Sequence, residues 1–374
     1  MDWTKGLKQQ NRDKAMDLIQ ENRKYKIGIL GCGKIAQVRH IPEYAANPRA
    51  QLYGYYSPTE SRAEEMAAKY GGKVYQSAEA LLADPELDVI SVCSVNSTHA
   101  EYTIAALNAG KHVLCEKPMA TCMEECLAMV DAARRSGRFL MLDMDQRMAP
   151  AHRKAKELLD RGAIGRVISF RTAYAHEGPE TWSIAPGRGT WFFDKDRAGF
   201  GVLGDLGIHK IDLIQFLLGQ RIVSVSAKLA TLDKTDPDGF PIRVEDNAFC
   251  IFEMSDGAVG TMTASWTCYG PEDNSTVLCG SRGIMRIYED PKHPLLIQYA
   301  DGSAEYFDCG AIQTNDNMTP SGIIDLWLDC IRTGTEPFIS GYDALSASRV
   351  LFAAQKSSET GRPVAIPENR VPFV

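Results

Sequence analysis

Short apolar segments and helical stretches take turns along the first part of the chain. Apolar runs rich in strand-forming residues occupy 25–30, 51–56, 89–95 and 113–115, and stretches with helical spacing follow the first three. Strands that alternate with helices favour a parallel sheet covered by helices on both faces. We therefore predict a doubly wound α/β domain over residues 25–147.

A different pattern begins after Pro150. Apolar and polar residues now alternate along longer segments, which Asp-Gly and Pro-rich turns connect: 167–174, 222–229, 247–254, 259–266 and 283–288. Such alternation is typical of antiparallel strands with one buried face. We predict an α+β domain with a large open, mainly antiparallel sheet over 148–374, and a polar leader over 1–24.

Composition narrows the class of protein. Hydrophobic residues make up 44% of the chain, which is typical of a globular protein, and the net charge of −7 argues against general nucleic-acid binding. No apolar run reaches the roughly 18 residues that a membrane span needs. The polar leader lacks the apolar core of a secretory signal. We expect a cytoplasmic protein without a nucleic-acid or membrane partner.

The ten cysteines show no Cys-x-x-Cys pair. Cys122 and Cys126 would share one face of a helix, but no histidine accompanies them at the spacing of a metal site. We predict reduced thiols and no bound metal.

A glycine-rich loop stands where the first strand gives way to a helix. Its sequence, Gly-x-Gly-x-x-Ala, contains Gly31, Gly33, Lys34, Ile35 and Ala36. The first glycine permits a tight turn, the second lets a pyrophosphate approach the backbone, and the small alanine lets helix and strand pack closely. The loop therefore predicts a bound dinucleotide, NAD or NADP; a tight turn without a ligand is the alternative.

The end of the second strand decides between the two dinucleotides. An acidic residue there would accept from the ribose 2′-hydroxyl and repel a 2′-phosphate. Ser57 occupies this place, and Arg62 follows five residues later, where it would pair with a phosphate or be a solvated helix residue. The sequence leaves NAD and NADP open.

Candidate reacting groups come from two separate segments. Lys117, in Glu-Lys-Pro after the 113–115 strand, is aimed out of its turn by the proline and would polarise a substrate oxygen. Asp205, His209 and Asp212 follow a glycine-rich run at i, i+4 and i+7 of a predicted helix. An imidazole there would take a hydroxyl proton at neutral pH, and a carboxylate would orient it. For Lys117 the alternative is a solvated surface charge. For His209 it is a helical histidine that a neighbouring aspartate satisfies for packing alone.

Together these motifs resemble the Gfo/Idh/MocA family of oxidoreductases. The resemblance rests on the glycine loop, on Glu116-Lys-Pro118 and on Gly204-Asp-x-Gly-x-His209, and it runs from about Tyr25 to Val364. It implies a Rossmann domain followed by a large open sheet whose outer face forms homo-oligomer contacts. It also implies that Lys117, Asp205 and His209 face the nicotinamide, with His209 as the base.

The resemblance extends to further cofactor contacts, with which we group His99. They are Ser94, Asn96, Glu116, Lys117 and Arg147. Two positions depart from the family pattern: Phe200 replaces the middle residue of a glycine triplet, and Asp145 stands where asparagine is frequent. Neither departure removes a reacting group.

We therefore predict a dehydrogenase that moves a hydride between a nicotinamide and a secondary hydroxyl of a sugar, cyclitol or glycoside. Two alternatives use the same parts: glycoside cleavage through transient oxidation and elimination with retained NAD, and a non-catalytic sensor. Sensors tend to lose the reacting lysine or histidine, and both are present here. Candidate substrate contacts, against the alternative of simple packing, are Trp182, Trp191, His176, Arg188 and Tyr269.

Overall fold

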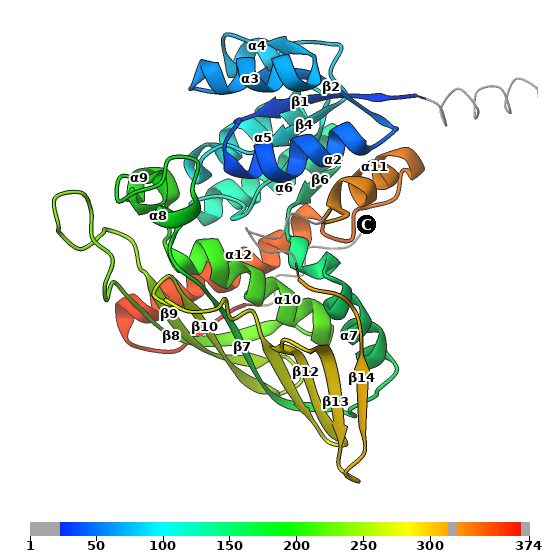
Figure 1. Ribbon diagram of the computed structural model, residues 1–374, viewed down its shortest axis with the longest axis vertical. Helices are drawn as coiled ribbons and strands as arrows, with labels where there is room; N and C mark the ends of the chain where they lie inside the picture. The colour runs from blue at the N-terminus through cyan, green and yellow to red at the C-terminus, as the bar shows by residue number, and fades with distance from the viewer. Residues whose placement is uncertain (1–22, 313–319, 368–374) are drawn as a thin grey trace, which may run out of the picture.

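The computed structural model describes residues 23–312 and 320–367, which form two sheets with their helices (Figure 1). The predicted leader lies almost entirely outside these residues. The first sheet has six parallel strands in the order β3-β2-β1-β4-β5-β6. Their bounds are β1 (Tyr25–Leu30), β2 (Ala50–Tyr56), β3 (Lys73–Val74), β4 (Val89–Val92), β5 (His112–Cys115) and β6 (Leu140–Leu142). This is the Rossmann order, with its switch point between β1 and β4.

Helices connect these strands and cover the sheet. After β1 the chain forms the wide turn η1 (Ala36–His40) and α2 (Ile41–Ala46). The others are α3 (Glu60–Tyr70), α4 (Ala78–Leu82), α5 (His99–Asn108) and α6 (Met123–Ser136), with the short turns η2 (Asn96–Thr98) and η3 (Asp145–Met148). All four residues of β4 are buried, as expected for a strand covered on both faces. The predicted parallel α/β architecture is confirmed.

The second sheet has nine strands in the order β14-β13-β12-β11-β7-β10-β9-β8-β15. All its neighbouring strands are antiparallel except β7 and β10. The bounds are β7 (Val167–Ala175), β8 (Ile222–Ala230), β9 (Asn247–Met254), β10 (Val259–Ser265), β11 (Thr276–Gly280), β12 (Gly283–Asp290), β13 (His293–Tyr299), β14 (Ala304–Phe307) and β15 (Val364–Ala365). The prediction of a mainly antiparallel sheet is confirmed, although sequence patterns did not predict β11, β13, β14 and β15.

One face of this sheet is covered and the other is open. Helices α7 (Pro150–Asp160), α10 (Ile208–Leu218) and α12 (Gly341–Thr360) pack between the sheet and the first domain (Figure 1). Shorter segments precede α10: α8 (Pro179–Trp182), η4 (Trp191–Phe193), α9 (Lys195–Ala198) and the π-helical turn η5 (Leu203–Gly207). On the open face, Ile168, Ile251 and Val259 remain about half exposed.

The C-terminal part of the chain returns to the first domain. Helix α11 (Ile323–Thr333) buries Trp327 beside His112 at the start of β5, and Asp325 accepts a hydrogen bond from Asn47. Helix α12 packs against α6. The two halves are therefore held together by more than the single crossing after η3. None of the described helices is long and apolar enough to cross a bilayer.

Candidate active site

A cavity of about 700 Å³ lies at the carboxyl ends of β1, β2, β4 and β5, between the two domains. Open α/β sheets bind ligands at this edge, next to the switch point. Residues of both domains line it, among them 31–35, 56–59, 93–96 and 116–118 from the first domain and Tyr174, His176, Trp182, Trp191, Asp205 and His209 from the second.

The glycine loop forms one end of the cavity. Gly31 has a φ of 92°, and a Cβ atom at this position would lie 2.6 Å from the carbonyl oxygen of Cys93. A Cβ on Gly33 would meet its nearest atom only at 3.9 Å, so the backbone there is open to a ligand. Lys34 and Ile35 line the cavity, and Ala36 is buried beneath them. This loop fits the pyrophosphate of a dinucleotide at a helix N-terminus.

The end of β2 carries no acidic residue toward the cavity. Ser57, Thr59 and Arg62 line this part of it. Arg62 forms no ion pair with any residue that the structure describes, so its guanidinium is available to a ligand. No acidic residue among those that line this part of the cavity would repel a 2′-phosphate.

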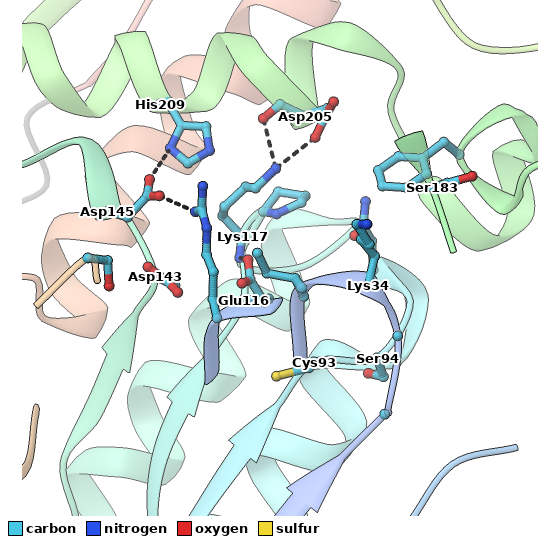
Figure 2. A pocket seen from close by; sticks show the side chains of 18 of the residues that line it. Lys34, Cys93, Ser94, Glu116, Lys117, Asp143, Asp145, Ser183, Asp205 and His209 are labelled. Carbon is cyan, nitrogen blue, oxygen red and sulfur yellow. Dashed lines mark hydrogen bonds and ion pairs between the residues drawn. The ribbon is translucent and has the colours of Figure 1, made fainter. Parts of the chain in front are cut away.

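At the other end of the cavity, Lys117 is bound to Asp205 (Figure 2). The Nζ atom donates to Oδ1 of Asp205 at 2.7 Å and to its backbone oxygen at 2.9 Å, and Trp266 Nε1 donates to Oδ2 at 3.1 Å. Burial alone would lower the pKa of Lys117, but Asp205 and Glu116 outweigh burial and raise it. Lys117 is therefore an ammonium held at a fixed place.

His209 lies in the first turn of α10, directly after the π-helical turn η5. Burial and the neighbouring Lys117 ammonium lower its pKa to about 4, so the imidazole is neutral at pH 7. A neutral imidazole is able to accept a proton. Asp212, which the sequence placed on the same stripe, lies farther along α10 and binds Arg147 instead.

A second buried cluster supports Glu116. His40 Nε2 lies 3.0 Å from Glu116 Oε1 and 3.1 Å from Asp143 Oδ2, and its Nδ1 lies 2.8 Å from Ser91 Oγ. Burial alone would lower the pKa of His40, but its neighbours, both carboxylates among them, hold it well above the usual value.

These three residues, His40, Glu116 and Asp143, are close enough together to hold a metal ion. However, the imidazole faces both carboxylates at hydrogen-bond distance, and the Lys117 ammonium already lies beside Glu116. We therefore assign the cluster to a shared proton. His40 and Asp143 were missed by sequence reasoning, although a histidine on the helix after a glycine loop is a signal that could have drawn attention.

Several predicted cofactor contacts also bind within the protein. Ser94 lines the cavity and accepts from Thr98, while Asn96 donates to the Ala198 carbonyl of α9 at 2.8 Å. The buried His99 ring lies between the carbonyls of Pro118 and Ser94, where it joins two turns of the cavity wall.

Arg147 does not line the cavity. Its guanidinium donates to both carboxylate oxygens of Asp212 at 2.6 and 2.7 Å and to the Phe338 carbonyl at 2.7 Å. The structure thus places it in a buried ion pair that ties η3 to α10. Arg188 is exposed and Tyr269 is 61% exposed, and neither lines the cavity.

A row of aromatic rings runs away from His209 along the cavity. Its centroid separations are 6.0 Å from His209 to Tyr174, 5.7 Å from Tyr174 to His176, and 6.1 Å from His176 to Trp182. The row continues through Phe192, which stacks on Trp191 at 4.0 Å. Sequence reasoning found His176, Trp182 and Trp191 but missed Tyr174 and Phe192.

The fold and the site together define a class: a two-domain, nicotinamide-dependent oxidoreductase whose cavity is lined by a lysine, an aspartate and a histidine. Comparison with known proteins agrees. Residues 25–144 match the model described as "Oxidoreductase family, NAD-binding Rossmann fold", and 152–286 match the "GFO/IDH/MocA C-terminal domain". The chain belongs to the Gfo/Idh/MocA family of oxidoreductases.

Several named relatives are sugar and cyclitol dehydrogenases. It is 30% identical to levoglucosan dehydrogenase of Pseudarthrobacter phenanthrenivorans, over 75% of this chain and 77% of that protein. It is 31% identical to glucose-6-phosphate 3-dehydrogenase of Bacillus subtilis, over 82% and 86%. The structure of a levoglucosan dehydrogenase in complex with NADH and levoglucosan aligns with a TM-score of 0.82 at 25% identity, covering 93% of this chain and 100% of the other.

Proposed function

We propose that the protein oxidises a secondary hydroxyl of a sugar, cyclitol or glycoside with NAD or NADP. The observation that carries this proposal is the convergence of Lys117, Asp205 and His209 at the end of the cavity that lies away from the glycine loop. The three residues come from separate segments, and a cation beside a neutral base suits the oxidation of a carbinol.

The glycine loop, Ser57 and Arg62 would hold the dinucleotide, and Glu116 lies beside the reacting residues. When bound, the nicotinamide ring accepts the hydride that leaves the carbinol carbon. His209 accepts the hydroxyl proton, so that the carbinol becomes a carbonyl. Lys117 donates a hydrogen bond to the same oxygen, and Asp205 fixes the ammonium in that position.

The aromatic row suits a ring-shaped polyol. Trp182, Phe192 and Trp191 offer apolar faces, while His176 adds a polar edge. Sites for small molecules combine such apolar walls with a few fixed polar groups. The named sugar and cyclitol dehydrogenases among the relatives support this substrate class.

The test is a panel of free sugars, cyclitols and glycosides incubated with NAD or NADP, with both cofactor absorbance and products followed. Reduced cofactor formed in equal amount to a keto product would support the proposal. Release of an aglycone without net reduction would overturn it in favour of elimination, and binding without turnover would point to a sensor. Lys228→Met, a change of an exposed lysine on β8, serves as the matched control for Lys117→Met.

The open face of the second sheet suggests contacts with a second copy of the chain. It exposes apolar side chains on neighbouring strands, with exposed fractions of 48% for Ile168, 54% for Ile251 and 47% for Val259. Adjacent exposed apolar residues are typical of interfaces. We expect a homo-oligomer by light scattering and dissociation in Ile251→Lys; an unchanged mass in that variant would contradict this interface.

A further inference from the structure

Asp145 lies beside His209, on the edge of the ring marked by the Nδ1 atom (Figure 2). Asp145 Oδ1 lies 3.5 Å from that nitrogen, and Oδ2 accepts from the guanidinium of Arg39. Arg39 belongs to η1, which follows the glycine loop. The three residues therefore join η1, the turn η3 after β6 and helix α10.

The Nδ1 atom of His209 is buried and has no hydrogen-bond partner within the usual distance. The carboxylate of Asp145 is the acidic group paired with it, although the separation is longer than a normal hydrogen bond. Catalytic hydrogen bonds in structures without substrate are often long and tighten in the complex. A buried donor without an acceptor is costly, so Asp145 has a physical reason to receive this N–H.

Several charged groups surround the imidazole. Lys117 and Glu116 approach from the turn after β5, Asp205 from η5, and Asp145 from η3. The Tyr174 ring packs against the imidazole from β7. Lys117 disfavours a protonated ring, whereas the carboxylates favour it. A neutral imidazole carries one N–H, and a carboxylate beside Nδ1 favours placing it there.

We propose that Arg39 and Asp145 form a positioning pair that holds His209 as the Nδ1–H tautomer and leaves Nε2 free to accept the substrate proton. This inference rests on the proposed role of His209 as the base. The ion pair with Arg39 holds the Asp145 carboxylate beside the ring. In the same way, a buried carboxylate fixes the tautomer of the catalytic histidine in a Ser-His-Asp triad.

Two variants of Asp145 separate its role as a hydrogen-bond acceptor from the effect of its negative charge. Asp145→Leu removes both acceptor and charge, and Asp145→Asn keeps an acceptor but removes the charge. Asp131→Asn, at a half-exposed position on α6 where the carboxylate also pairs with arginine, is the matched control. Nitrogen NMR of protein labelled in its histidine rings and saturated with NAD reports the tautomer directly, and His209→Gln identifies the signal.

The native protein and Asp131→Asn are expected to show a protonated Nδ1 at His209. Asp145→Leu is expected to lose that preference and about 10²-fold in kcat. Asp145→Asn is expected to keep the tautomer and to move the acidic limb of kcat/KM down by about one pH unit, because removing an anion lowers the pKa of the imidazole.

An unchanged tautomer in Asp145→Leu would overturn the proposal. So would an unchanged acidic limb in Asp145→Asn, and this second test stands if the leucine variant fails to fold. The tautomer is read without turnover. A fully active His209→Gln would therefore refute the base assignment alone, and the NMR result would still decide the role of Asp145.

Discussion

The two ends of the cavity are built in different ways. At the dinucleotide end, backbone geometry makes the site: Gly31 turns tightly at positive φ, and Gly33 leaves its backbone open. At the end proposed to carry out the reaction, called the reacting end below, charged side chains make the site: the partly buried Lys117 and the buried Asp205 form an ion pair, and His209 beside them is neutral. The first end depends on one contiguous loop, whereas the second depends on contacts between remote segments.

This difference predicts which property a variant at each end should lose. A backbone change at the glycine loop should weaken cofactor binding and leave the reacting residues in place. A charge change at the other end should reduce turnover and leave cofactor affinity almost intact. A single variant that changed both cofactor affinity and turnover would show that the two ends are coupled.

The largest effect is expected for Lys117→Met. Removing the ammonium takes away the hydrogen bond to the substrate oxygen and leaves Asp205 as an unpaired buried carboxylate, so kcat should fall by about 10²- to 10⁴-fold. NAD affinity, measured by calorimetry, should stay within about threefold of the native value, because the substitution leaves the glycine loop unchanged. Near-native turnover, with Lys228→Met as the control, would exclude the assignment.

Gly31→Ala tests the opposite end. The alanine would have to keep a positive φ, and its Cβ would lie 2.6 Å from the carbonyl oxygen of Cys93. The loop must therefore shift. We expect the Kd for NAD to rise about tenfold or more. Gly110→Ala is the control, because Gly110 also has a positive φ but meets nothing within 4 Å. Equal loss of affinity in both variants would mean that strain alone, and not the loop contact, is responsible.

A smaller and more selective effect is expected for Arg62→Ala. If the guanidinium faces a 2′-phosphate, KM for NADP should rise by about tenfold while KM for NAD changes by less than about twofold. Steady-state kinetics with both cofactors measures this. Parallel changes for the two cofactors would show that Arg62 acts on the shared part of the dinucleotide.

The smallest effect concerns pH. His209 accepts a proton only when neutral, and its pKa is lowered to about 4 by burial and Lys117. Activity should therefore be constant from pH 7 down to about pH 5 and fall below that, as the imidazole becomes protonated. A kcat/KM profile with its acidic limb near 6.5, the ordinary histidine value, would contradict this description of the reacting end.

The contrast between the two ends also explains what the sequence could predict. Local sequence patterns predicted the dinucleotide end, because strand β1, the glycine loop and the following helix are contiguous in the chain. The Glu-Lys-Pro motif after β5 is also a local pattern. The fold class followed from strand and helix alternation. In the second sheet, β11 and β13 were missed because their buried positions do not alternate with exposed ones. Strands β14 and β15 were missed because they have only four and two residues.

At the reacting end, a local motif marked Lys117 and His209 but not their surroundings. Arg39 and Asp145 meet across 106 positions of sequence, and such pairs form only in the folded chain. Arg147 was expected at the cofactor, yet tertiary packing joins it to Asp212. The domain limits at residues 147 and 148 stay a prediction, because α12 packs against α6 and β6 of the first half as well as α10 and β8 of the second.

A structure of the enzyme with NAD and a sugar substrate tests the central claim most directly. The account predicts the reacting hydroxyl oxygen within about 3.2 Å of both His209 Nε2 and Lys117 Nζ. A bound, oxidisable substrate whose hydroxyl lies beyond hydrogen-bond reach of either nitrogen would contradict it.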